Sequence, residues 1–166
     1  MPTETIVTPA GPELRRLAEE LIDEQSTMTL ATAKEDIAWA APVYYVFFKS
    51  CFYFFSDPDS RHIREALRSG QASSAIHAPA STWQEIRGIQ MSGVVEDVST
   101  HVESWGAVRA YLKKFPFTKN FFASDAPLDL AAFARRFRVR LYRLKPTFIY
   151  YLDNGIRFGF RERLVF

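Results

Sequence analysis

The chain has 166 residues, with 21 Lys and Arg against 19 Asp and Glu, and 48% of its residues are hydrophobic by a broad count. This composition is typical of one folded domain spanning residues 1–166, and a chain of this size can bury about 70% of its extended surface without disulfides or a metal. The single cysteine, Cys51, excludes an internal disulfide, and His62, His77 and His101 are too far apart for a zinc-ligand spacing.

The first predicted elements are a helix and two hairpins. An N-terminal helix is expected over about residues 12–25, because apolar side chains recur at three- and four-residue spacing, namely Leu14, Leu17, Ala18, Leu21 and Ile22. Alternation and β-branched residues then predict a strand over Ser26–Ala33. A turn at residues 34–36 leads into a strand over Ala38–Phe48, and a tight turn at residues 49–50 leads into a third strand over Cys51–Phe55.

A polar loop at residues 56–60 separates these strands from a short helix. Ser60 is placed to cap a helix over Arg61–Arg68, which Gly70 ends. Two further strands are expected, near Ala72–His77 and over about Glu85–Val98. Gly88 and Gly93 are the expected bulges or points of close backbone approach in the second of these strands.

The last third of the chain is predicted to contain two helices and two strands. The start of Thr100–Phe122 is helical in pattern, and a short helix is expected over Leu128–Ala134. Alternating apolar and arginine residues predict a strand over residues 136–141, and another is expected over Thr147–Leu152. The fold class is therefore α+β and mainly antiparallel β, a barrel or sheet with peripheral helices.

Positive charge is concentrated near the C-terminus, where residues 135–166 hold nine Lys and Arg but two Asp and Glu. The predicted strand places Arg136, Arg138 and Arg140 on one face. A solvated or subunit-facing strand is the favoured explanation, attraction of an acidic ligand comes second, and nucleic-acid binding is favoured least, because the whole chain has a net charge of only +2.

Common catalytic and nucleotide-binding motifs are missing. The sequence contains no G-x-G-x-x-G, no P-loop, no G-x-S-x-G and no H-E-x-x-H, so it lacks the signatures of Rossmann, P-loop, α/β-hydrolase and zincin chemistry. Cys51 starts a strand beside a single Lys, and a core position is a better explanation for it than catalysis.

The most informative segment runs from an aromatic strand through Ser56 and Ser60 to Arg61 and His62. Hydroxyl, guanidinium and imidazole donors here meet the free N–H groups of a helix N-terminus, a combination suited to a phosphate group. On spacing alone, a capped surface helix with solvated charges is the favoured explanation.

This segment resembles the FMN-binding split barrel of the pyridoxamine 5'-phosphate oxidase superfamily. The family pattern is an aromatic strand ending in Tyr-Thr, then Ser-Arg-Lys, a short helix, a strand, a Trp and Arg-x-Val-x-x-x-Gly. The matching residues here are Phe55-Ser56, Ser60-Arg61-His62, residues 72–77, Trp83 and residues 87–93. The resemblance covers about residues 26–98, and residues 110–111, 115–116, 153–154 and 158–159 extend it to a poorly characterised branch.

The resemblance implies a split β-barrel with peripheral helices that binds FMN at the interface of a homodimer. It places the phosphate grip on Ser56, Ser60, Arg61 and His62, after Phe55. It also implies that the isoalloxazine ring lies along a strand through Pro42, Val43, Tyr44 and Tyr45, whose backbone would contact the polar edge of the ring.

Several positions depart from the family pattern. His62 replaces a Lys, Tyr45 or its neighbour replaces another Lys, and Gly88 stands where the family has a flavin-contacting Gln, for which Gln90 on the same strand face is a substitute. The substrate-binding Arg-x-His of true pyridoxamine phosphate oxidases is absent from residues 160–164, so we do not expect vitamin B6 oxidation.

The functional expectation is an FMN-dependent oxidoreductase acting on an unknown small molecule, with the redox chemistry supplied by the flavin and no side chain assigned a catalytic role. A non-enzymatic module of the same fold, holding a flavin, deazaflavin or haem, is the alternative.

The longest apolar run, Ala38–Phe48, is shorter than the roughly 20 residues of a membrane helix, and no signal-peptide pattern is present, so a cytoplasmic protein without a membrane partner is expected. The 15 Phe, 7 Tyr and 3 Trp are numerous enough that some rings should face a flat ligand or a partner subunit.

Overall fold

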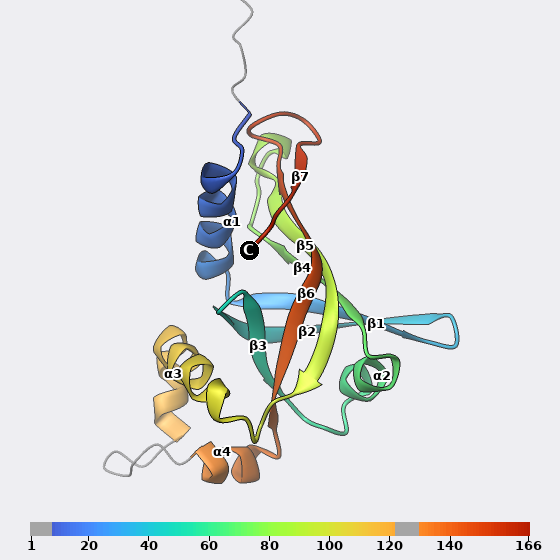
Figure 1. The fold of residues 1–166 in the computed structure, drawn as a ribbon, viewed down its shortest axis with the longest axis vertical. Helices are drawn as coiled ribbons and strands as arrows, with labels where there is room; N and C mark the ends of the chain where they lie inside the picture. Colours follow the sequence, from blue (N-terminus) through green and yellow to red (C-terminus); the bar gives the residue numbers. More distant parts are fainter. Residues whose placement is uncertain (1–7, 122–129) are drawn as a thin grey trace, which may run out of the picture.

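A computed structural model describes residues 8–121 and 130–166 and shows a closed, antiparallel β-barrel with helices around it (Figure 1). The strands are β1 (Thr27–Lys34), β2 (Ile37–Phe48), β3 (Cys51–Ser56), β4 (Ala72–His77), β5 (Arg87–Asp97), β6 (Arg140–Asp153) and β7 (Arg161–Arg163). Their order in the sheet is β3-β2-β1-β4-β5-β6-β7, and pairing of β3 with β6 closes the barrel. The predicted α+β class with a split barrel is confirmed.

The helices are α1 (Pro12–Glu24), α2 (Arg61–Ser69), α3 (Trp105–Lys114) and α4 (Leu130–Phe137), with short 3₁₀ turns at Trp83–Glu85, Val102–Ser104 and Pro116–Phe121. Figure 1 shows α1 alongside the barrel, α2 on the opposite side and α3 near the end where α4 lies. None of the helices in the described part of the chain is long and apolar enough to cross a membrane.

Both predicted hairpin turns are present, and neither contains glycine. Glu35 and Asp36 turn β1 into β2 with φ values of 52° and 62°, and Lys49 and Ser50 turn β2 into β3 with φ values of 47° and 59°. Two successive residues in the left-handed region are the mark of a type I′ turn, whose twist matches that of the flanking strands. The β1–β2 hairpin is the longer one, and its tip projects from the barrel (Figure 1).

Two hydrophobic clusters stabilise the fold. The larger fills the barrel and the space under α1, and its fully buried rings include Tyr45, Phe52, Phe54, Tyr142, Tyr151 and Phe160. The smaller lies between the outer face of β3 and α3, and it contains Cys51, Tyr53 and Tyr111. Cys51 is buried, which confirms its expected core position, and this burial raises the pKa of the thiol.

The two glycines expected on β5 both lie where backbones approach closely. A side-chain carbon at Gly93 would lie 2.2 Å from the Lys145 carbonyl oxygen, at the point where the β5–β6 register shifts. A side-chain carbon at Gly88 would lie 2.7 Å from the Ile76 carbonyl oxygen. Only glycine fits such positions without moving the neighbouring strand.

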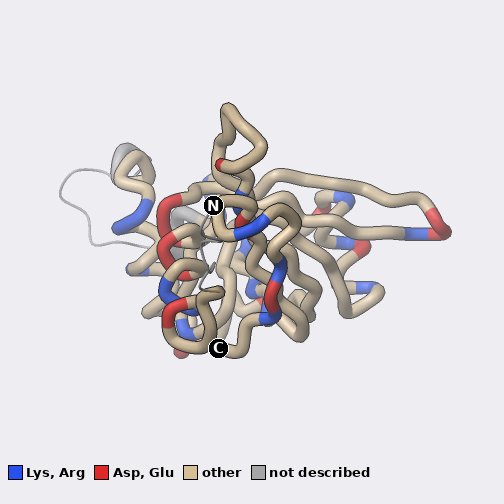
Figure 2. The backbone as a smooth tube through the Cα atoms, turned by 90° about the horizontal axis from the view of Figure 1, so that it is seen from above, with Lys and Arg blue, Asp and Glu red and all other residues tan. Residues whose placement is uncertain are grey.

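The C-terminal prediction of an arginine-lined strand is wrong. Arg136 lies in α4, Arg138 has φ of 54° just beyond that helix, and β6 begins at Arg140. Arg140 binds Asp97 of the neighbouring strand at 3.1 Å, so the three arginines do not share a strand face. Figure 2 shows both signs of charge spread along the chain, the projecting hairpin tip included. The structural basis for a nucleic-acid groove on this strand is therefore lost.

The predicted helix over Leu128–Ala134 is displaced, since α4 covers Leu130–Phe137, and residues 128 and 129 lie outside the described part of the chain. The strand expected over Thr147–Leu152 is the second half of one long strand, β6. The short strand β7 was not predicted.

Lys114, near the end of α3, links three elements. Its ammonium donates a hydrogen bond to the Ile22 carbonyl oxygen in the last turn of α1 at 3.2 Å and lies 4.3 Å from the centre of the Tyr45 ring. The Tyr45 hydroxyl donates to the same carbonyl at 2.6 Å. Burial lowers the pKa of Lys114 to about 8, and the negative charge of Asp23 opposes this shift only in part.

We expect this lysine to make stability depend on pH between about 8 and 10. In that range the unfolded chain, whose lysine keeps an ordinary pKa, binds more protons than the folded chain, so the free energy of unfolding should rise with pH. Urea unfolding of the wild type and of Lys114→Met at several pH values in this range measures the effect. The wild type should gain stability relative to the variant as pH rises, and parallel curves for the two proteins would contradict the expectation.

Candidate functional site

The candidate site lies where β2 and β3 separate. The two strands pair only from Tyr45 to Phe48 of β2, so the earlier residues 37–44 pair with β1 alone. The last two residues of β3 pair with β6 alone, with Phe55 opposite Leu141 and Ser56 opposite Arg140. The loop after β3 and the N-terminus of α2 follow the point at which β3 and β2 have separated (Figure 1), and we call this point the opening.

Three of the four predicted phosphate-binding side chains meet at this opening. The Ser56 hydroxyl lies 2.8 Å from Nε2 of His62, the Ser60 hydroxyl lies 3.3 Å from the same nitrogen, and the two hydroxyls are 3.4 Å apart. We call Ser56, Ser60 and His62 the Ser–His cluster. Asp57 shapes the loop before it, since its side chain accepts a hydrogen bond from the backbone N–H of Asp59.

Ser60 occupies the N-cap position of α2 with extended backbone angles, as predicted, but its side chain forms no capping hydrogen bond. The hydroxyl turns to the Ser–His cluster instead. The first N–H groups of α2 are therefore not satisfied by this side chain, and they lie next to hydroxyl and imidazole groups that can also donate.

His62 is suited to a neutral role in the free protein. Burial lowers its pKa below the ordinary value, and the negative charge of Glu65 opposes this effect only in part. A neutral imidazole next to a serine hydroxyl also resembles part of a hydrolytic triad. Within the described residues, however, no carboxylate forms a hydrogen bond with His62, so the third member of a triad is missing.

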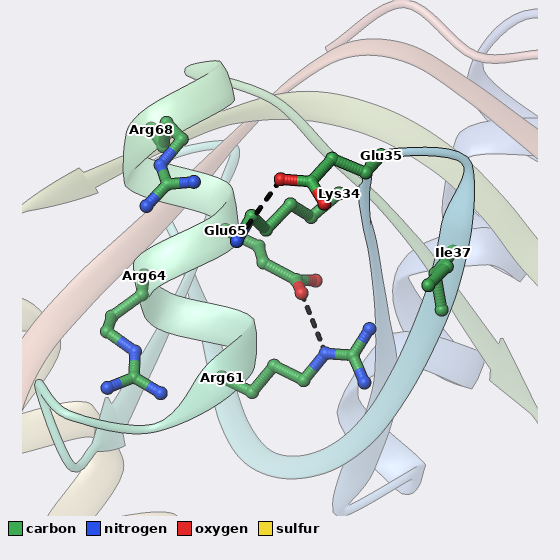
Figure 3. A pocket seen from close by; sticks show the side chains of 7 residues that line it. All are labelled: Lys34, Glu35, Ile37, Arg61, Arg64, Glu65 and Arg68. Carbon is green, nitrogen blue, oxygen red and sulfur yellow. Dashed lines mark hydrogen bonds and ion pairs between the residues drawn. The ribbon is translucent and has the colours of Figure 1, made fainter.

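Arg61, the fourth predicted phosphate ligand, points in another direction. Its Nε donates to Glu65 at 2.7 Å, and its guanidinium carbon lies 4.7 Å from the centre of the Trp39 ring on β2 (Figure 3 shows the Arg61–Glu65 pair). Glu65 is buried and also accepts a hydrogen bond from Thr32 at 2.6 Å. These two donors lower the pKa of Glu65. Arg61 thus bridges α2 and β2, beside the Ser–His cluster rather than within it.

The strand expected to line a flavin ring presents alternate side chains to opposite faces. Val43 and Tyr45 point into the core, while Pro42 and Tyr44 are exposed on the outer face of the sheet. The Tyr44 ring packs edge-on against Phe115 at 5.5 Å and Phe117 at 6.0 Å.

Phe55, at the end of β3, is half-buried and packs edge-on against Tyr111 of α3 at 5.1 Å. It therefore belongs to the contact between the barrel and α3.

Trp39 was not predicted as a site residue. Its place next to Arg61 had no signal in the sequence, because it depends on how α2 packs against the projecting hairpin.

Gln90 does not join the Ser–His cluster in this chain. Strand pairing places Pro42, Thr29, Ala75, Gln90 and Tyr150 in one row across five neighbouring strands. Three strand spacings separate Pro42 from Gln90 in this row, a path of about 14 Å along the curved sheet. Gln90 instead lines a shallow groove of about 340 Å³ on the outer face of the sheet.

Small side chains make up much of this outer face. A second row, next to the first, runs through Ala40, Ala31, Ser73, Ser92 and Phe148. Phe148 is 51% exposed, and a guanidinium from Arg163 lies 5.1 Å from its ring centre. This face was not predicted, although small residues at alternate positions of β1, β4 and β5 are a sequence pattern that could have indicated it.

The fold and the opening between β2 and β3 define a split-barrel protein. A protein-family model described as pyridoxamine 5'-phosphate oxidase matches residues 14–152, and the chain belongs to this family. Among curated proteins, the chain is 24% identical over 140 residues to a "UPF0306 protein" of Klebsiella pneumoniae, covering 83% of this chain and 84% of that protein.

Solved structures agree on the fold. A haem-binding protein from Mycobacterium smegmatis superposes with a TM-score of 0.69 at 20% identity, over 96% of this chain and 59% of that one. This chain therefore spans about three fifths of that protein. An FAD-binding protein from Mesorhizobium loti superposes with a TM-score of 0.60 at 14% identity, over 81% of this chain and 90% of that one.

The donors at the opening fit a flavin phosphate better than a metal. Two hydroxyls, an imidazole and the start of a helix can all donate to phosphate oxygens, and a guanidinium lies beside them. No group of three or more His, Cys, Asp or Glu residues in the described ranges could hold a metal ion.

Proposed function

We propose that this protein binds FMN in the opening between β2 and β3 and acts as a flavin-dependent oxidoreductase on a small molecule. The observation that carries the proposal is the Ser–His cluster at the N-terminus of α2. Its donors, with Arg61 beside them, would hold the phosphate, and the unpaired edge of β2 would run along the ring. When bound, FMN would supply the hydride or electron transfer.

Within this proposal, the residues of the chain bind and orient the flavin. Hydroxyls of Ser56 and Ser60 would donate to phosphate oxygens, and Arg61 would balance the charge while remaining bound to buried Glu65. Backbone groups around Pro42–Tyr44 would fix the polar edge of the ring. No side chain at the opening is assigned a proton-transfer step.

We also propose that two copies associate through the outer face of the sheet. The face consists mostly of small and uncharged side chains and carries exposed Phe148 at its margin. In this arrangement the Gln90 of a second copy would reach the flavin, whereas the Gln90 of the same chain lies three strand spacings, about 14 Å along the sheet, from the lining strand.

A haem is the less favoured cofactor. The Mycobacterium smegmatis neighbour is a haem-binding protein by name, and a haem requires an axial ligand such as a histidine nitrogen. Nε2 of His62 already lies within hydrogen-bond distance of two serine hydroxyls, which favours an oxygen-rich anion over iron at this site.

Native mass spectrometry of the purified protein tests the cofactor and the assembly together. A dimer mass carrying one FMN per chain would support the proposal. A haem mass, or a protein whose melting temperature does not rise and whose FMN fluorescence is not quenched on titration with FMN, would contradict it.

FMN affinity should rise as pH falls from about 8 to about 6.5. The ring of His62 is neutral in the free protein because burial lowers its pKa, and a bound phosphate would favour the protonated ring, so binding would take up a proton. Fluorescence titrations across this range measure the slope. Riboflavin binding should show no such slope, and His62→Gln should remove it for FMN; an unchanged slope in the variant would exclude His62 as its source.

A further inference from the structure

The side of α2 that faces the projecting hairpin forms a second hollow, and Arg61 lies at the border between it and the Ser–His cluster. Its volume is about 470 Å³, and the β1–β2 hairpin closes one side of it with the side chain of Ile37 (Figure 3). Arg61, Arg64 and Arg68 line it from α2. Their spacing of three and four residues places all three on one helical face.

Positive charge in this hollow exceeds negative charge. Lys34 joins the three arginines, and the lining carboxylates are Glu35 and Glu65. Glu65 is bound to Arg61 at 2.7 Å, and Glu35 pairs with Lys34 at 3.4 Å.

Arg64 and Arg68 are left with no carboxylate partner in residues 8–121 and 130–166, and both are exposed. Figure 3 shows their guanidinium groups on the same side of the helix, one turn apart. Like charges at this spacing repel each other, so the arrangement disfavours the free helix unless an anion lies between them.

The chemistry of these groups selects phosphate. A guanidinium donates two parallel hydrogen bonds to phosphate oxygens, and two arginines one turn apart, about 5.4 Å along the axis, can each hold one of two linked phosphate groups. A volume of about 470 Å³ lies within the range of small-molecule sites, roughly 300–1,000 Å³. Ile37, which is 61% exposed, lines the hollow from the hairpin, across from Arg64 and Arg68 (Figure 3).

We propose that this hollow is a binding site for a small multivalent phosphate, such as the diphosphate group of a nucleotide, held by Arg64 and Arg68 with Lys34. The site differs from the one proposed for FMN. The Ser–His cluster lies on the other side of Arg61, and His62 is rotated by about 100° around the helix from its neighbour Arg61. The proposal does not depend on flavin binding.

The test uses the full chain and three probes, namely pyrophosphate, ADP and inorganic phosphate, in calorimetric titrations. We expect saturable binding of pyrophosphate and ADP, and binding of phosphate at least about tenfold weaker. The double variant Arg64→Gln/Arg68→Gln should lose at least about tenfold in pyrophosphate affinity. Arg109→Gln, which removes an exposed arginine from α3, is the matched control and should bind as the wild type does.

A titration of the double variant with FMN distinguishes this site from the flavin site. The double variant should bind FMN with the same affinity as the wild type. The proposal would be overturned if pyrophosphate did not saturate, if Arg109→Gln lost as much affinity as the double variant, or if FMN displaced pyrophosphate one for one. Binding of single-stranded RNA through the same arginines, more tightly than ADP, would also overturn it in favour of a macromolecular partner.

Discussion

Arg61→Gln should weaken FMN binding about 10- to 100-fold and change riboflavin affinity by less than about threefold. Riboflavin lacks the phosphate, so the difference between the two ligands isolates the charge-assisted contact to that group. Gln keeps a side-chain amide that can donate to buried Glu65, which also retains its hydrogen bond from Thr32. Fluorescence quenching titrations of both flavins provide the measurement.

Riboflavin also reports on folding in this experiment, because a variant that fails to fold loses both ligands. Arg64→Gln is the matched control, since it removes an arginine one turn along α2 on the face of the separate hollow. Equal losses of FMN and riboflavin affinity in Arg61→Gln, or an equal loss of FMN affinity in Arg64→Gln, would contradict the proposed phosphate grip.

The parts of the fold that sequence predicted well are those with strong local patterns. The helix α1 with its apolar stripe, the strand β1 with its alternation, the strand β2 and the helix between Ser60 and Gly70 all lie within a residue or two of their predicted limits. Gly70 ends α2 in the left-handed conformation with φ of 71°, as a glycine at that position predicts. In these segments local preference and tertiary packing favour the same structure.

The C-terminal error has a physical cause. Residues 130–138 contain apolar residues at spacings that suit a helix as well as a strand. Arg138, just after the helix, has a positive φ, and because it is not a glycine the sequence gives no indication that the helix ends there. The alternating residues from Arg140 onward belong to β6. This strand pairs with β5, which lies more than 40 residues earlier in the chain, and its Arg143 and Arg140 form ion pairs with Glu96 and Asp97 of β5. Such long-range pairing cannot be read from a local period.

The sequence predicted that Ser56, Ser60 and His62 lie close together, but it did not predict the direction of the Arg61 side chain. Ser56, Ser60 and His62 meet because β3 leads directly into a short loop and α2, a local connection that the sequence contains. Arg61 turns away because buried Glu65, one helical turn later, accepts its Nε, and the depth of Glu65 depends on how α2 packs against Thr32 of β1. That packing has no signature in the sequence.

The aromatic residues divide between core and surface. Rings such as Tyr45, Phe52 and Phe54 fill the barrel, so much of the aromatic excess is explained by packing. The expectation that some rings serve a ligand or a subunit contact rests on exposed members, above all Tyr44 next to the opening and Phe148 on the outer face of the sheet. Both lie on the surface that the proposed second copy would cover.

Ala75→Glu should convert the proposed dimer into a monomer at micromolar concentration. Ala75 lies in the middle strand of the row from Pro42 to Tyr150, and its side chain points outward, so the isolated barrel can accept a glutamate there. Between two copies, however, each carboxylate would be buried without a partner or brought near its counterpart, which costs several kcal/mol. Native mass spectrometry and light scattering measure the assembly.

Val102→Glu is the control, because Val102 is 80% exposed and lies in the 3₁₀ turn before α3, away from the outer face of the sheet. This variant should remain a dimer. If the flavin site needs Gln90 of a second copy, FMN affinity should fall together with the dimer in Ala75→Glu and should not fall in Val102→Glu. A monomer that retains full FMN affinity would show that one chain binds the flavin alone, and a persistent dimer would show that the copies meet through a different face.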